Sequence, residues 1–209
     1  MRPPQYFVIE GPPGVGKTRL TQHLAEHLHA TALLDPVVEN TFLPRFYTDP
    51  ARYALPTQLD FLLKRLRVFE HIGKPDLFHG KVISDVLPER DALYAKLMLA
   101  ADEYAIYDAM RARLTHAVPQ PDLVIYLQAS ADWLLDHSAH PYRHLPQLTE
   151  GQVRETADAY TAFFHQYQAA PLLIVNIEHL DLTQAHDIAL LQQRIHAMRG
   201  MREFFNKGD

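Results

Sequence analysis

The stretch GPPGVGKT, residues 11–18, lies between an apolar run, YFVIE at residues 6–10, and a helix-like stretch, RLTQHLAEHLH at residues 19–29. Its spacing, Gly-x-x-x-x-Gly-Lys-Thr, is that of a phosphate-binding loop. Glycine permits backbone angles that a Cβ excludes, so successive N–H groups can turn inward onto phosphate oxygens. A strand before the loop and a helix after it therefore predict a nucleoside triphosphate site, and leave the phosphoryl acceptor open.

The residues of this loop have separate expected roles. Lys17 supplies a positive charge for the β- and γ-phosphates, and the hydroxyl of Thr18 can bind Mg²⁺. The helix that follows presents the positive end of its dipole to the same anion. The residues expected to bind the nucleotide are Gly11, Gly14, Val15, Gly16, Lys17 and Thr18.

The order of apolar segments predicts the fold class. Five short, continuous apolar runs are typical of strands covered on both faces of a parallel sheet. Helical patterns separate them, and strand alternating with helix indicates a doubly wound α/β domain. We expect a three-layer sandwich, a five-stranded parallel sheet with helices on both faces, as one domain over residues 1–209. The predicted strands are 6–10, 32–35, 81–84, 123–128 and 172–177, and the predicted helices are 17–29, 56–72, 90–116 and 152–168.

The composition excludes several classes of partner. The 209 residues carry a net charge of -5, which argues against nucleic acid as the main partner. The chain has no cysteine, which excludes disulfides and thiolate metal sites and fits a reducing compartment. No apolar run reaches the roughly 18 residues of a membrane span. We therefore expect a cytoplasmic protein with small-molecule ligands and no membrane partner.

A long segment after the phosphate loop bears on the acceptor. Residues 33–65, LLDPVVENTFLPRFYTDPARYALPTQLDFLLKR, resemble the deoxynucleoside kinase family, especially its bacterial deoxyadenosine and deoxyguanosine kinases. In that family a carboxylate-Pro-Val-like turn, an Asn-x-Phe-Leu stretch, a Tyr-x-Asp and a helical Gln follow in this order. Later stretches look like its acidic strand-end motif, its fourth strand and its last strand: VISDVLPERDALYAKLML at 82–99, PDLVIYLQAS at 121–130 and PLLIVNI at 171–177.

The resemblance covers nearly the whole chain and implies an activity. It implies a P-loop kinase fold that transfers the γ-phosphoryl group of ATP, with Mg²⁺, to the 5′-hydroxyl of a deoxynucleoside in nucleotide salvage. A purine, deoxyadenosine or deoxyguanosine, is the expected acceptor because the most similar members use purines. The family also implies a homodimer, which we expect to form through the helices 56–72 and 90–116.

Two acidic residues at predicted strand ends match catalytic positions of the family. Asp35 aligns with the general base, which is usually Glu, and its side chain is about 1.5 Å shorter in reach. Glu39, four residues on, is the alternative base. Asp85 matches the acid near Mg²⁺ and the 5′-hydroxyl, so Thr18 and Asp85 are the expected metal ligands. In many relatives an Arg follows this acid; here Val86 follows, and we expect Arg90 to substitute.

The acceptor pocket requires a polar edge and apolar walls. Gln58 matches the helical Gln of the family, whose amide offers both a donor and an acceptor to a nucleobase. Tyr47 matches the tyrosine that meets the sugar 3′-hydroxyl, with Glu155 as its expected acidic partner. Lys96 takes the place of a family Arg near the base or the phosphates. Aromatic walls are expected from Phe46, with Phe42 and Phe61 as further candidates.

One part of the family pattern is depleted. Relatives carry an arginine-rich lid after the fourth strand, whereas the corresponding residues 132–147, DWLLDHSAHPYRHLPQ, retain Arg143 alone. We expect this short lid to bring Arg143 to ATP. Either Arg90 and Arg154 share its task, or turnover is slow, or the histidines contribute when protonated. His137, His140 and His144 are not expected to form a metal site, because Pro141 interrupts the helix that would align them.

Two alternatives remain open from the sequence. A nucleoside monophosphate kinase, such as a thymidylate kinase, needs a dedicated arginine pair for the acceptor phosphate, and Arg45 with Arg65 could be that pair. A nucleotide-binding regulatory protein with weak catalysis would fit the depleted lid.

Overall fold

The computed structural model describes residues 5–70, 72, 80–115, 118–137 and 148–208. Six parallel strands form one sheet in the order β2-β3-β1-β4-β5-β6. The doubly wound α/β prediction is confirmed, although the sheet has six strands where we predicted five. The strands are β1 Tyr6–Glu10, β2 Thr31–Leu33, β3 Val82–Ser84, β4 Leu123–Gln128, β5 Leu172–Asn176 and β6 Arg202–Phe205.

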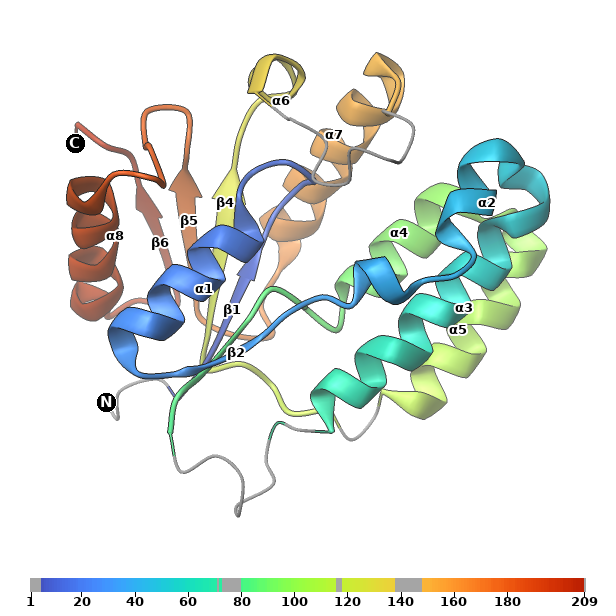
Figure 1. Cartoon of the computed structure of the whole chain (residues 1–209), viewed down its shortest axis with the longest axis horizontal. Helices are drawn as coiled ribbons and strands as arrows, with labels where there is room; N and C mark the ends of the chain where they lie inside the picture. Colours follow the sequence, from blue (N-terminus) through green and yellow to red (C-terminus); the bar gives the residue numbers. More distant parts are fainter. Residues whose placement is uncertain (1–4, 71, 73–79, 116–117, 138–147, 209) are drawn as a thin grey trace.

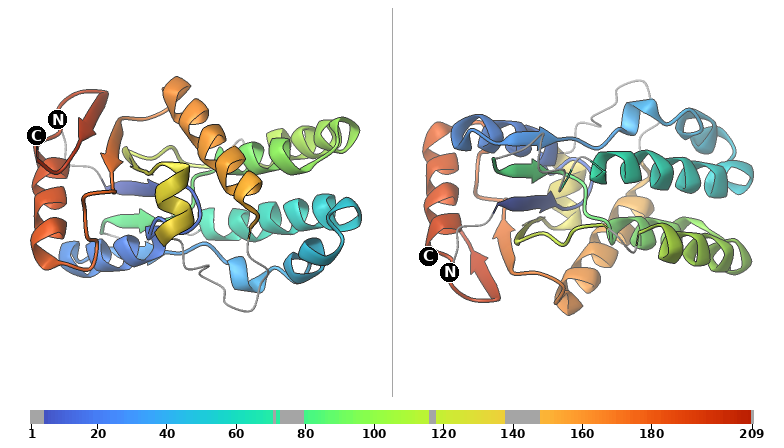
Figure 2. Two further views of the ribbon diagram at one scale, coloured as in Figure 1. Left: turned by 90° about the horizontal axis from the view of Figure 1, so that it is seen from above. Right: turned by 90° about the horizontal axis from the view of Figure 1, so that it is seen from below.

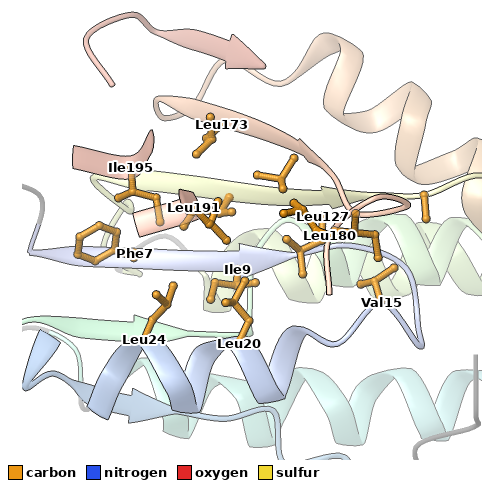
Figure 3. Packing of buried hydrophobic residues seen from close by; sticks show 14 of the residues in the cluster. Phe7, Ile9, Val15, Leu20, Leu24, Leu127, Leu173, Leu180, Leu191 and Ile195 are labelled. Carbon is orange, nitrogen blue, oxygen red and sulfur yellow. The ribbon is translucent and has the colours of Figure 1, made fainter. Parts of the chain in front are cut away.

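The strands form where the sequence is continuously apolar because both faces of the sheet are covered. In β1 every residue is buried. Phe7 and Ile9 point to one face, and Tyr6 and Val8 to the other, as the two-residue period of a strand requires. Figure 3 shows the first of these faces, where Leu20 and Leu24 of helix α1 pack against Ile9.

The helices cover both faces of the sheet. Leu20 and Leu24 of α1 and Leu191 and Ile195 of α8 belong to the same buried cluster on one face, and the aromatic residues of α7 pack on the other. Figure 1 shows α2–α5 gathered on one side of the molecule and α8 on the opposite side, and Figure 2 shows the same arrangement from above and from below. The helices are α1 Lys17–Leu28, a 3₁₀ turn η1 Val37–Glu39, α2 Leu43–Thr48, α3 Pro50–Phe69, α4 Arg90–Met98, α5 Ala101–Leu114, α6 Ala131–His137, α7 Glu150–Gln166 and α8 Ala185–Ala197.

Two predicted helices differ from the structure. Helix α3 starts six residues before the predicted 56, because Asp49 caps it by accepting a hydrogen bond from the Arg52 N–H, and Pro56 lies inside it. The predicted helix 90–116 is two helices, α4 and α5, which are separated where Leu99 and Ala100 adopt extended backbone angles. Residues 71 and 116 of these predictions lie outside the described residues.

The carboxyl ends of the strands define the functional edge of the molecule. In Figure 1 the loop between β1 and α1 and the helix α6 lie at this same edge. Helix α6 is the first part of the expected lid, and lid residues 138–147 lie outside the described part of the chain. Among the described helices, none has the length and apolar character needed to cross a bilayer.

Candidate active site

The phosphate loop needs glycine at several positions, because a side chain there would either clash with the sheet or strain the backbone. A Cβ on Gly11 would lie 2.5 Å from the carbonyl oxygen of Leu127 on β4, so the loop passes directly against the sheet. Gly14 and Gly16 have φ values of 90° and 89°, in the left-handed region that favours glycine. Val15 is buried, and Figure 3 shows its side chain among the core residues. Its side chain therefore anchors the loop, and its contribution to nucleotide binding is limited to the backbone.

Lys17 and Thr18 begin helix α1 directly after this loop. The Lys17 Nζ donates to the carbonyl oxygens of Gly11 and Pro12, at 2.6 and 2.9 Å, so the ammonium group lies across the loop. Burial lowers the pKa of Lys17 to about 8, since the nearby carboxylates offset the loss of hydration only in part. A phosphate in the loop would provide the negative charge that this buried cation lacks.

Asp85 connects the donor side of the site to the acceptor side. It follows β3, and its carboxylate accepts a hydrogen bond from the Thr18 hydroxyl at 2.6 Å and another from the Asp35 backbone N–H at 2.7 Å. Burial raises the pKa of Asp85, and the hydrogen bond from Thr18 opposes that rise. The two acids therefore lie beside the phosphate loop, Asp85 directly after β3 and Asp35 two residues after the end of β2.

Asp35 is held by two arginines. Its carboxylate accepts two hydrogen bonds from the Arg65 guanidinium, both at 2.9 Å, and a third from Arg90. Burial alone would raise the pKa of Asp35, but the two guanidinium groups outweigh burial and hold it below its ordinary range. The side chain is 11% exposed, so a small ligand can still reach it. Asp35 is therefore a permanently ionised carboxylate in a fixed orientation.

Arg90, the expected substitute for the family Arg, contacts Asp35 and the backbone of Asp85. It is the first residue of α4, and its guanidinium lies 3.3 Å from the backbone carbonyl oxygen of Asp85. Val86, which occupies the position of the usual family Arg, is fully buried in the core instead. Arg90 thus reaches Asp35 and the Asp85 backbone from a position four residues beyond Val86.

Three further residues of this network were missed by sequence reasoning. Arg65 also pairs with Asp91, which is buried at the start of α4. Glu10, at the end of β1, is fully buried and forms an ion pair with Arg90 at 3.5 Å. Glu10 could have been found from the sequence, because it is an acid at the end of a fully buried strand directly before the phosphate loop. Arg65 could have been found from its spacing of seven residues from Gln58, which places both on one helix face.

The acceptor-side candidates lie on α2 and α3. Gln58 is buried on α3, and its amide donates to the Met98 sulfur at 3.2 Å. Phe46 and Tyr47 on α2 form an edge-to-face ring pair with centroids 5.6 Å apart and pack against the cluster around Leu62. The Arg65 guanidinium carbon lies over the Phe61 ring, 4.4 Å from the ring centroid. Phe61 therefore places an aromatic wall beside the charged network. Gln58, Phe61 and Arg65 are thus carried by α3, and Phe46 and Tyr47 by α2, which packs against it.

Other candidates lie apart from the network. Lys96 on α4 and Glu155 on α7 are exposed, and their substrate roles stay predictions. Arg154 pairs with Asp132 and Glu150 at the surface, at 2.8 and 2.9 Å. Arg143, with His140 and His144, lies outside the described residues. His137 stacks on Trp133 with ring centroids 4.4 Å apart.

Comparisons with known proteins identify the family. The deoxynucleoside kinase family profile matches residues 7–196. A deoxyadenosine kinase of Lactobacillus acidophilus is 29% identical over 192 residues, which is 85% of this chain and 87% of that protein. A deoxyguanosine kinase of Lactobacillus johnsonii is 26% identical over 215 residues, covering 95% and 94%.

A solved structure supports the fold independently. The deoxyadenosine kinase from M. mycoides with bound dCMP and dCDP superimposes with a TM-score of 0.77 at 20% identity, covering 92% of this chain and all of that one. A match of the family profile to almost the whole chain, together with an intact phosphate loop joined to two strand-end acids, leads to one assignment. The chain belongs to the deoxynucleoside kinase family and is an ATP-dependent phosphotransferase.

Proposed function

We propose that the protein, a single cytoplasmic domain over residues 1–209, transfers the γ-phosphoryl group of Mg²⁺-ATP to the 5′-hydroxyl of a purine deoxynucleoside. The observation that supports this best is the short path from donor to acceptor. Thr18, Asp85 and Asp35 are linked by two consecutive hydrogen bonds of 2.6 and 2.7 Å. The second of these bonds comes from the Asp35 backbone N–H, so the residue whose carboxylate would receive the hydroxyl proton lies beside the triphosphate end, as in-line transfer requires.

In this proposal Asp35 orients the acceptor and receives its proton. Its pKa lies below the ordinary range, so the carboxylate is ionised at every physiological pH and can always accept a hydrogen bond from the 5′-hydroxyl. Phosphoryl transfer passes through a loose transition state in which positioning and charge neutralisation dominate over proton abstraction. A rigidly held carboxylate fits that demand, even though it is a weak base.

The oxygen ligands fit Mg²⁺. A metal ion of this kind prefers one or two protein oxygens and completes its shell with phosphate oxygens and water. The Thr18 hydroxyl and the Asp85 carboxylate lie within hydrogen-bond distance of each other beside the loop, which suits two adjacent coordination positions. Bound there, the ion would neutralise phosphate charge, while the protein residues fix its place.

The preference for a purine rests on the relatives, and Gln58 supplies an amide that can meet a nucleobase edge. The two bacterial relatives described above are a deoxyadenosine kinase and a deoxyguanosine kinase. The Gln58 amide donates to a thioether, which is a weak acceptor, so a nucleobase edge can displace that contact at little cost. The amide then offers its donor and its acceptor to the base.

The monophosphate kinase alternative has less support. Arg65 lies buried between Asp35 and Asp91, so its charge is already neutralised by two carboxylates. Arg45 is exposed on α2, with its guanidinium 5.9 Å from the centre of the Tyr53 ring. This arrangement does not supply a paired guanidinium site for an acceptor phosphate.

A panel assay tests the proposal. Purified protein with Mg²⁺-ATP is offered deoxyadenosine, deoxyguanosine, deoxycytidine, thymidine and the corresponding monophosphates, and products are separated by chromatography. We expect 5′-monophosphates from a purine deoxynucleoside and no diphosphates from the monophosphates. Phosphorylation of monophosphates alone would replace the proposal by the second kinase class. Binding of ATP without transfer to any acceptor would favour a regulatory protein.

The pKa of Lys17 makes ATP binding dependent on pH. Because this pKa is lowered to about 8, the ammonium form is lost as the pH rises through 8, whereas bound phosphate favours the ammonium form. We expect the Kd for ATP to rise by up to about tenfold per pH unit above pH 8. Titration calorimetry between pH 7 and 9.5 measures it. Lys17→Arg keeps its charge throughout and should flatten the dependence; an equal rise in both proteins would exclude Lys17 as the titrating group.

A homodimer through the α3–α5 side is part of the proposal. Ile106, Met110 and Leu114 recur every four residues on α5 and are 40–58% exposed, and Leu63 on the packed neighbour α3 is 51% exposed. Such a stripe of large apolar side chains is typical of an interface. We expect Ile106→Glu to convert a dimer to a monomer in sedimentation velocity. Met201→Glu, an equally exposed position on the far side, is the control; a wild-type monomer would contradict the proposal.

A further inference from the structure

The guanidinium of Arg90 is held through both of its terminal nitrogens. Nη2 contacts Asp35, the proposed proton acceptor. Nη1 donates to the carbonyl of Asp85 at 3.3 Å and forms an ion pair with Glu10 at 3.5 Å. The Arg90 side chain is only 5% exposed, so water cannot orient it and its partners must do so.

Glu10 is itself fixed by contacts from three separate parts of the chain. Its first carboxylate oxygen accepts hydrogen bonds from the Gly11 N–H and the Tyr160 hydroxyl, both at 3.0 Å. Its second oxygen accepts from the Leu87 N–H at 3.3 Å, in the segment that follows Asp85. A fully buried carboxylate with this many donors has its orientation determined by the fold.

Tyr160 supplies the contact to Glu10 that comes from α7. It is 1% exposed, and its ring lies in an aromatic stack with Tyr126 at 6.4 Å and an edge contact with Tyr94 at 6.1 Å. The stack leaves the ring little freedom, so the hydroxyl meets Glu10 at a fixed point. Tyr160, Glu10 and Arg90 thus form a chain of contacts from α7 through β1 to α4 and on to Asp35.

We propose that Tyr160 and Glu10 are positioning residues for catalysis, which act by holding the Arg90 guanidinium against Asp35. This inference rests on the proposed function, because it assumes that Asp35 orients the 5′-hydroxyl. Arg90 lies five residues beyond Asp85, and its guanidinium is held against Asp35 with Glu10 as its second acidic partner. Loss of the anchor would let Arg90 move and leave Asp35 held by Arg65 alone.

A double-mutant cycle separates positioning from general support of the fold. We expect Tyr160→Phe to lower kcat for nucleoside phosphorylation by about tenfold with the KM for ATP unchanged, because Tyr160 does not contact the phosphate loop. In an Arg90→Lys background the same change should alter kcat by less than about twofold, since the group that Tyr160 acts through is already lost. A merely structural role would give the same factor in both backgrounds and would overturn the inference.

Two controls complete the experiment. Tyr167→Phe removes another buried hydroxyl at the end of the same helix, one with no hydrogen-bond partner among the described residues, and should leave kcat unchanged. If Arg90→Lys does not fold, the cycle is repeated in Glu10→Gln, where Tyr160→Phe should again lose its effect. An inactive wild type in the nucleoside panel would instead remove the proposed function, so the two failures are distinct. A wild-type-like kcat for Tyr160→Phe also overturns the inference.

Discussion

Asp35→Asn should lower kcat for deoxynucleoside phosphorylation by about 10²–10⁴ while the KM for ATP stays within a few-fold of wild type. The substitution keeps the shape and one acceptor oxygen but removes the charge that Arg65 and Arg90 hold in place. The acceptor hydroxyl then loses its proton acceptor, and the two guanidinium groups lose the partner that orients them. Steady-state kinetics with a purine deoxynucleoside measures the effect.

Glu39→Gln is the matched control for this variant. Glu39 lies in the 3₁₀ turn four residues after Asp35 and is exposed, whereas Asp35 sits inside the charged network. We expect its kcat to remain near that of wild type. A result in which Asp35→Asn retains activity and Glu39→Gln loses it would assign the base to Glu39. Thermal unfolding of both variants shows whether lost activity reflects lost structure.

Lys17→Met is expected to reduce kcat by about 10²–10³ and to raise the KM for ATP as well. Its ammonium group is the cation that crosses the phosphate loop, bonded to the carbonyls of Gly11 and Pro12. Methionine fills the same volume without the charge, so charge developing on the transferred phosphoryl group is left uncompensated. Single-turnover phosphoryl transfer at saturating ATP separates this loss from weaker binding.

Lys81→Met serves as the control for Lys17. Lys81 directly precedes β3, so it lies at the amino ends of the parallel strands, whereas the phosphate loop follows the carboxyl end of β1. Its removal changes the net charge by the same amount and should leave kcat unchanged. Equal losses in the two variants would show that overall charge, and not the position of Lys17, controls the rate.

Local patterns predicted the donor half of the site. The glycine spacing and the apolar run before it identified the loop, and continuous apolar runs identified five strands, of which β1, β4 and β5 are buried along almost their whole length. Asp85 was found because ligands of parallel sheets gather at strand ends. The sixth strand was missed because Arg202–Phe205 is short, carries charges and lies at the exposed edge.

The acceptor half depends on contacts that no local pattern encodes. Arg65 reaches Asp35 across 30 residues and Asp91 across 26, and Tyr160 reaches Glu10 across 150. The family resemblance supplied Asp35 and pointed to Arg90 but gave no partner for either. The break between α4 and α5 was equally hidden, because the apolar residues on both sides continue the helical spacing.

Gly11 packs tightly against the Leu127 carbonyl, and Val15 is inserted into the core. These two contacts fix the phosphate loop to the sheet. Such a loop is held rigidly before ATP binds, so the site for the phosphates is preformed. Adaptation to different sugars or bases must then come from the opposite wall, where α2 and α3 carry Tyr47 and Gln58. Changes in acceptor specificity can therefore arise in α2 and α3 without altering the residues that bind ATP.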